Sequence, residues 1–189
     1  EFQTQSGETI AIPATLLISA ISVIDDVSRC ITADAKAAGN FLLLLGRTAP
    51  HLGGSHYLLV QGDQTGNDVP PVDVPANLKV MRAVQAAIEA GAVRSCHDLS
   101  EGGLAVAAAE MAFSGGLGVE IDLAAMPTTD NSVGDQARLF AESSGRFLVE
   151  VAPEKYDAFL RIVKDSPVGE VGKVTDTGLA QESAQGQFA

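Results

Sequence analysis

The sequence is poor in basic residues and has no long apolar run. Lys and Arg together number 12 against 24 Asp and Glu, which gives a net charge of -12 with no local basic cluster. Such a surface repels phosphate backbones, so we expect no nucleic-acid partner. The apolar runs are far shorter than the roughly 20 residues that span a bilayer, so we expect no membrane partner either.

Cysteine is scarce as well. Cys30 and Cys96 lie far apart, without a CxxC or a metal-ligand spacing. A disulfide between them stays open, but two buried thiols in a reducing cytosol are the favoured interpretation. No basic segment precedes an apolar one at the N-terminus, so secretion has no support and we expect a cytoplasmic location. Residue 1 is Glu rather than Met, so we expect a piece of a longer protein.

The length of 189 residues, 46% of them hydrophobic, predicts one domain over 1–177. The Gln, Ser, Gly and Ala of 178–189 predict a disordered or truncated tail. Strands alternating with helices indicate an α/β or α+β domain with a mixed sheet and packed helices. We predict strands at 16–24, 41–45, 57–60, 93–96, 119–123, 147–151 and 170–175, and helices at 75–91, 104–113, 133–142 and from 153 onward.

The most informative segment joins a predicted strand to a buried helix. With Ser100 as the N-cap, Gly102 and Gly103 fall in the first turn, where backbone N–H groups are open to an anion. Asp98 and Glu101 add negative charge there, so bare phosphate is repelled, whereas Mg²⁺ bridging carboxylate and phosphate resolves the conflict. A capped helix start explains the same residues, and the residues alone slightly favour it.

Two further segments suggest anion binding more weakly. Gly53, Gly54 and Ser55 precede a predicted strand and could form a nest of amides for phosphate, although a turn is the favoured interpretation. Arg146, at a predicted strand start, could hold an anion, but a solvated arginine is favoured. Cys96 and His97 are neighbours on an extended chain and point to opposite faces, so they fail as a catalytic pair. No Walker A, GxGxxG or Ser/His/Asp order is present.

The run His-Asp-Leu-Ser-Glu-Gly-Gly-Leu at 97–104 resembles the C-terminal-domain motif of the aminoimidazole ribonucleotide (AIR) synthetase-like superfamily. That superfamily includes AIR synthetase, selenophosphate synthetase, the hydrogenase maturation protein HypE and thiamine-monophosphate kinase. Three further stretches, 12–26, 52–57 and 142–147, are similar in the same order to the second such domain of the phosphoribosylformylglycinamidine synthase family. Ala14, where the family commonly has a second Pro, and the tail from 178 depart from the pattern.

The resemblance implies the last domain of an ATP-dependent ligase that converts formylglycinamide ribonucleotide (FGAR) to the amidine with ammonia from glutamine. It implies ATP and Mg²⁺ as cofactors of the full-length protein. The implied partners are the N-terminal domains of the same protein and a glutaminase domain or subunit. No catalytic residue is assigned. The implied nucleotide- or phosphate-binding residues are Gly53, Gly54, Ser55, Ser100, Gly102 and Gly103, and the implied metal ligands are Asp98 and Glu101.

Two alternatives stay open. The domain could be a non-catalytic scaffold that holds an auxiliary Mg-nucleotide, or the chain could belong to a selenophosphate synthetase or kinase of the same superfamily. The stretches 12–21 and 53–57 speak against the second. We expect the fragment alone to be inactive. Because the apolar strand 16–24 would lose its neighbouring domain, we also expect weak self-association.

Overall fold

The computed structural model describes residues 2–11, 17–62, 66 and 68–176, and its centre is a five-stranded sheet in the order β4-β6-β3-β7-β5. The strands of this sheet are β3 (Phe41–Leu45), β4 (Ser95–Asp98), β5 (Gly118–Ile121), β6 (Phe147–Val151) and β7 (Val168–Thr175). A separate hairpin near the N-terminus consists of β1 (Phe2–Gln3) and β2 (Thr9–Ile10).

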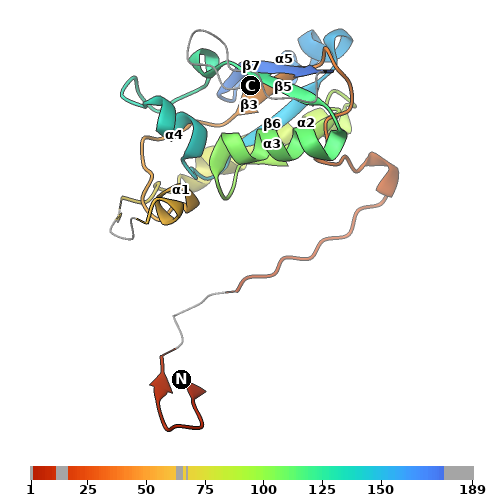
Figure 1. Cartoon of the computed structure of the whole chain (residues 1–189). Helices are drawn as coiled ribbons and strands as arrows, with labels where there is room; N and C mark the ends of the chain where they lie inside the picture. Colours follow the sequence, from red (N-terminus) through yellow and green to blue (C-terminus); the bar gives the residue numbers. More distant parts are fainter. Residues whose placement is uncertain (1, 12–16, 63–65, 67, 177–189) are drawn as a thin grey trace.

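Helices cover the sheet on both faces (Figure 1). The α-helices are α1 (His56–Val60), α2 (Val74–Glu89), α3 (Gly103–Gly115), α4 (Asp135–Phe140) and α5 (Tyr156–Val163), and the 3₁₀ turns are η1 (Val27–Arg29), η2 (Leu123–Ala125) and η3 (Pro153–Lys155). Helices α3 and α4 contact each other, as do α2 and α5. The expected α/β class is therefore confirmed.

The central strand β3 shows how the two cores form. Its leucines alternate, so that Leu42 and Leu44 join the core beneath α3 while Leu43 and Leu45 join the core beneath α2 and α5. All four are at most 1% exposed. A short uninterrupted apolar run is what a strand covered on both faces requires, which is why 41–45 was predictable.

All four ladders of the five-stranded sheet are antiparallel, so the expectation of a mixed sheet is wrong. The parallel pairing in the described part of the chain is an isolated bridge between Thr48 and Thr128. The β3–β7 register shifts after Leu42, which pairs with Gly172 while Leu43 pairs with Glu170. This bulge lies beside Val171, which is fully buried in the core beneath α3.

Glu150 on β6 is the least expected member of the interior, since its alternation with apolar neighbours predicts a polar face. The residue is fully buried, and its carboxylate accepts four hydrogen bonds. The donors are the Lys36 and Ala37 N–H groups at 2.8 and 3.1 Å, the Asn40 amide at 2.5 Å and the Ser95 hydroxyl at 2.8 Å. This carboxylate therefore fixes the chain that leads into β3 against the sheet.

Two strand predictions are wrong. Residues 17–24 form an extended segment outside both sheets, and Leu17 is 88% exposed; Leu16 lies outside the described residues. Residues 57–60 belong to helix α1, whose N-cap is Ser55, with its hydroxyl accepting from the Leu58 N–H. Four apolar residues cannot distinguish a helical from an extended period, and the cap decided the outcome.

The remaining elements were placed correctly to within a few residues. The strand expected at 93–96 lies at 95–98, and Gly116, in the left-handed region, ends α3. Helix α2 forms as predicted but buries Val80, Val84 and Ala87, whereas Leu78 and Met81 are 43% and 48% exposed.

The expectation of two buried thiols is wrong for Cys30. Cys30 is exposed, and Cys96 is partly buried against the core beneath α2; both are free. The expected disorder or truncation of 178–189 lies outside the described residues. Among the residues that are described, no helix is long and apolar enough to cross a bilayer.

Candidate functional site

Three segments that are far apart in the sequence meet at Glu142, which follows α4. One oxygen of its carboxylate accepts the His56 N–H at 2.8 Å and the Gly102 N–H at 2.9 Å. The same oxygen lies 3.3 Å from His56 Nδ1. The start of α1 and the start of α3 are therefore joined through a single partly buried carboxylate.

Arg146 holds the turn that carries Glu142. Its guanidinium is 1% exposed and donates to the Ser143 carbonyl at 2.8 Å, the Thr48 hydroxyl at 3.0 Å and the Ala141 carbonyl at 2.5 Å. Burial lowers the pKa of Arg146 to about 10, while the Glu142 charge raises it, so the side chain stays protonated at neutral pH. The expectation of a solvated arginine is wrong: this cation is structural and holds protein oxygens.

Helix α3 begins in a glycine pair rather than at a side-chain cap. Gly102 is the N-cap with φ +76°, and Gly103 follows with φ +65°. A Cβ on Gly103 would lie 2.6 Å from the Ala141 carbonyl oxygen and 2.7 Å from that of Leu139, so no other residue fits. Ser100 is not the N-cap as expected, because its hydroxyl donates to the Asp98 carboxylate instead.

An acidic rim surrounds a small cavity of about 180 Å³ at this helix start. The side chains of Asp98 and Glu101 are 63% and 79% exposed. At the back, His97 is fixed on both ring nitrogens, by the Asp98 carbonyl at 2.7 Å and by the Glu110 carboxylate at 2.9 Å. Glu110 was not singled out as a site residue, although a lone acid on an otherwise apolar helix was a signal of a polar partner. The cavity lining is His97, Asp98, Ser100, Glu101, Val106, Ala107 and Glu110.

The glycine-rich segments make most of their amide contacts inside the protein. The Gly53 N–H donates to the Asp68 carbonyl at 2.9 Å, and the Ser55 N–H donates to the Leu52 carbonyl at 3.1 Å. The Gly103 N–H donates to the Ser100 carbonyl at 3.2 Å. The turn interpretation of 53–55 is thus favoured over an open nest, and a phosphate here would meet mainly exposed groups such as the Ser100 hydroxyl and the Gly54 backbone.

The groups available to a metal ion at this cavity are the two exposed carboxylates of Asp98 and Glu101, which do not enclose an ion on all sides. Within the described ranges, no group of three or more His, Cys, Asp or Glu side chains is arranged to hold an ion. Mg²⁺ typically uses one or two carboxylates together with waters and substrate phosphates. Asp98 and Glu101 therefore fit Mg²⁺ that arrives with a nucleotide, and do not fit a permanent structural metal.

Cys96 and His97 do not form a catalytic pair, as their alternation predicts. Cys96 packs on the α2 side of the sheet, whereas His97 contacts Glu110 of α3 on the other side. Burial raises the pKa of the Cys96 thiol to about 12, and Asp98 adds to this effect, so thiolate is negligible at neutral pH.

Solved structures share the fold of this chain. PurL of Thermotoga maritima complexed with FGAR has a TM-score of 0.72 at 22% identity, over 79% of this chain and 26% of that one. Hydrogenase maturation protein HypE in complex with ATP has a TM-score of 0.62 at 19% identity, over 86% of this chain and 53% of that one. At these identities the likeness shows the fold alone: the chain folds as parts of PurL and HypE do.

Sequence comparison then gives the family. The family model for the AIR synthase related protein, C-terminal domain, matches residues 37–182. The chain belongs to this family, which confirms the resemblance drawn from the 97–104 motif.

Two curated relatives are both phosphoribosylformylglycinamidine synthase subunits PurL. The one from Alkaliphilus metalliredigens is 32% identical over 182 residues, 95% of this chain and 23% of that protein. The one from Moorella thermoacetica is 35% identical over 166 residues, 88% of this chain and 21% of that protein. The chain thus spans less than a quarter of the length of the curated relatives that it matches.

Replacing Glu142 by Ala should free the two loops that it joins. Charge-assisted hydrogen bonds contribute about 1.5–3 kcal/mol each, and two amides lose one acceptor, so we expect a loss of about 2 kcal/mol in unfolding free energy. Amide exchange at Gly102 and His56 should accelerate, as followed by NMR. Glu154→Ala, an exposed acid on η3, is the control and should change neither quantity. Unaltered exchange at Gly102 in Glu142→Ala would contradict this assignment.

Replacing Arg146 by Leu should destabilise the fold more strongly. The change leaves the buried carbonyls of Ala141 and Ser143 without donors, so we expect a loss of about 3 kcal/mol in denaturant unfolding. Arg146→Lys should lose less unfolding free energy than Arg146→Leu but more than the control, because an ammonium keeps the charge but not the planar fork of donors. The exposed Arg82→Leu on α2 is the matched control, expected within about 0.5 kcal/mol of the parent. Equal losses in Arg146→Leu and Arg82→Leu would refute the structural role.

Proposed function

We propose that this chain is the C-terminal domain of a phosphoribosylformylglycinamidine synthase. The observation that supports this proposal most strongly is the similarity to two PurL subunits, over 95% and 88% of the chain. The proposed reaction of the whole protein is FGAR + ATP + NH₃ → amidine + ADP + phosphate. ATP activates the amide oxygen as a phosphorylated imidate, and ammonia then displaces phosphate from the amide carbon. The proposal carries with it a cytoplasmic location.

In this proposal the acidic loop receives a magnesium nucleotide. Asp98 and Glu101 are the residues that would hold Mg²⁺, and the ion would supply charge neutralisation for a bound phosphate. The Ser100 hydroxyl and the exposed backbone at Gly54 then contact phosphate oxygens. Solved T. maritima PurL structures complexed with ATP, ADP and AMPPCP support a nucleotide site in relatives of this fold.

A second candidate function is a scaffold that retains an auxiliary nucleotide without performing chemistry. The observation that favours it is the site itself: His97 is fixed on both ring nitrogens and the Gly102 N–H is already taken by Glu142. Both ring nitrogens of His97 are thus engaged within the protein, and neither is free to act on a bound substrate. Turnover would then depend on other domains of the protein.

The same proposal implies partners. More than three quarters of each curated relative lies outside the matched region, which supports further domains of the same polypeptide. Ammonia must be supplied by a glutaminase domain or subunit. The structural similarity to PurLQS from T. maritima supports an assembly of this kind, with a TM-score of 0.65 over 79% of this chain.

The isolated chain should not catalyse the reaction, because its described site lacks a complete set of reacting groups. We expect the full-length polypeptide to convert FGAR with ATP and ammonium chloride, as measured by phosphate release and chromatography of the amidine. The 189-residue chain should give only background. Absence of amidine with a folded full-length polypeptide would overturn the proposed function. Turnover by the 189-residue chain alone would overturn the proposal that this domain needs the other domains for catalysis.

Asp98→Asn in the full-length polypeptide separates the two candidate functions. A catalytic nucleotide site predicts at least a 100-fold fall in kcat, because one metal ligand loses its charge. An auxiliary site predicts nearly unchanged kcat with lower thermal stability and less co-purified nucleotide. Asp165→Asn, an exposed acid after α5, is the matched control and should change none of these quantities. Parent-like activity, stability and nucleotide content in Asp98→Asn would exclude both roles.

A further inference from the structure

Helix α3 carries one charged side chain, that of Glu110, in a run of Gly, Ala, Val, Leu, Met, Phe and Ser. Its carboxylate lies 2.9 Å from Nε2 of His97, which comes from strand β4. The Glu110 side chain is 45% exposed, and that of His97 is 21% exposed. The acid has no basic residue on α3 to pair with, so its specific partner is this histidine on the sheet.

The His97 ring links Glu110 to Asp98. Its other nitrogen, Nδ1, lies 2.7 Å from the Asp98 carbonyl oxygen. A carbonyl oxygen can only accept a hydrogen bond, so Nδ1 is the donor. Bonds at both nitrogens fix the ring, because rotation about its Cβ–Cγ bond would break at least one of them.

The peptide unit that follows Asp98 is held from its other side as well. Its N–H belongs to Leu99 and donates to the Arg146 carbonyl at 3.0 Å. The Leu99 side chain is buried in the core beneath α3. Since a peptide unit is planar, a bond at its carbonyl and a bond at its amide together fix its orientation. The direction in which Asp98 presents its carboxylate to the cavity therefore depends on the His97 ring.

We propose that Glu110 is a positioning residue, which acts through the His97 ring to orient the Asp98 carboxylate for a divalent cation. An acid that is already oriented loses less conformational freedom when it binds an ion, so the affinity is higher. The inference deepens the proposed function and rests on it in taking Asp98 as a residue that would hold Mg²⁺.

Packing of α3 does not require the contact between Glu110 and His97. Leu104, Ala107 and Met111 on the same helix are buried in the core that the helix shares with the sheet. These apolar contacts place the helix, whereas the polar contact adds the orientation of one ring. If the contact only tied α3 to β4, its loss would change stability and leave the affinity for a cation unaltered.

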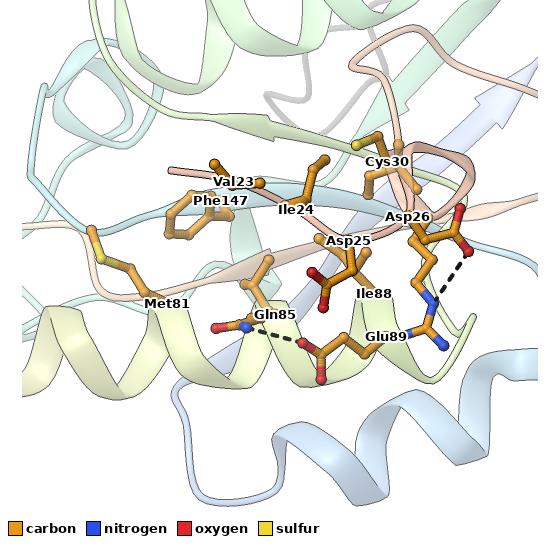
Figure 2. Close-up of a pocket in the computed structure, with 13 residues that line it drawn as sticks. Val23, Ile24, Asp25, Asp26, Cys30, Met81, Gln85, Ile88, Glu89 and Phe147 are labelled. Atoms are coloured by element: carbon orange, nitrogen blue, oxygen red, sulfur yellow. Dashed lines mark hydrogen bonds and ion pairs between the residues drawn. The ribbon is translucent and has the colours of Figure 1, made fainter. Parts of the chain in front are cut away.

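Glu89 on α2 is a matched control on the opposite face of the sheet. Its carboxylate accepts a hydrogen bond from Gln85 Nε2 at 2.9 Å, as Figure 2 shows. It lies on the wall of a groove of about 840 Å³ between α2 and the chain at 23–31. Glu89→Ala therefore removes the same charge and a hydrogen bond of the same length from a different helix.

Manganese binding to the 189-residue chain tests the proposal without turnover. Mn²⁺ alone is the probe, and its affinity is read from paramagnetic broadening of the Asp98 and Glu101 amide NMR signals. Glu110→Ala should weaken this affinity about 10-fold or more and shift the ¹⁵N signals of the His97 ring. Glu110→Gln should stay within about 3-fold of the parent, because its amide oxygen accepts the same bond. Glu89→Ala should bind Mn²⁺ as the parent does.

Each alternative gives a different result. Alanine is the best helix former and the Glu110 side chain is partly exposed, so Glu110→Ala should stay folded, as circular dichroism checks. Parent-like Mn²⁺ affinity or parent-like ring signals in Glu110→Ala would overturn the proposal. An equal loss in Glu110→Gln would assign the effect to charge and also overturn it. Absence of broadening in the parent chain would overturn it too, whereas the proposed synthase function is tested separately by amidine formation.

Discussion

The geometry of the site depends on one buried cation. Arg146 is bound by two carbonyls and a hydroxyl, and these bonds fix the turn between α4 and β6. Glu142 lies within that turn, so its carboxylate reaches both the start of α1 and the start of α3. A guanidinium in this position is costly to desolvate, and three oriented oxygens together with the Glu142 charge offset that cost.

The same turn explains why α3 must begin in glycine. The carbonyls of Leu139 and Ala141 lie so close to Gly103 that a Cβ cannot be accommodated. Close approach brings the first turn of the helix against the end of α4 and positions the loop that carries Asp98 and Glu101. Asp98 and Glu101 therefore lie on a loop whose supporting polar groups are already hydrogen-bonded within the protein. A bound cation would change little in that supporting structure.

Sequence patterns predicted elements well where burial alone decides the structure. The uninterrupted leucines of β3, the alternation in β5 and the amphipathic α5 all formed. Patterns failed where a distant partner decides. Arg146 and Glu150 look like solvated charges in sequence, and both are buried because oxygens and amides from other segments meet them. The role of Glu142 could not be predicted either, since its partners His56 and Gly102 are 86 and 40 positions away.

The failure at 17–24 has a different cause. Its composition is that of a buried strand, but a buried strand needs at least one hydrogen-bonded neighbour and cover on both faces, and the described residues supply neither. Strands β4 and β5 are the two edges of the five-stranded sheet, and residues 17–24 pair with neither of them. The pattern at 17–24 encodes burial, but whether a strand forms depends on a covering surface, and the described residues do not provide one. Composition alone therefore could not place this segment.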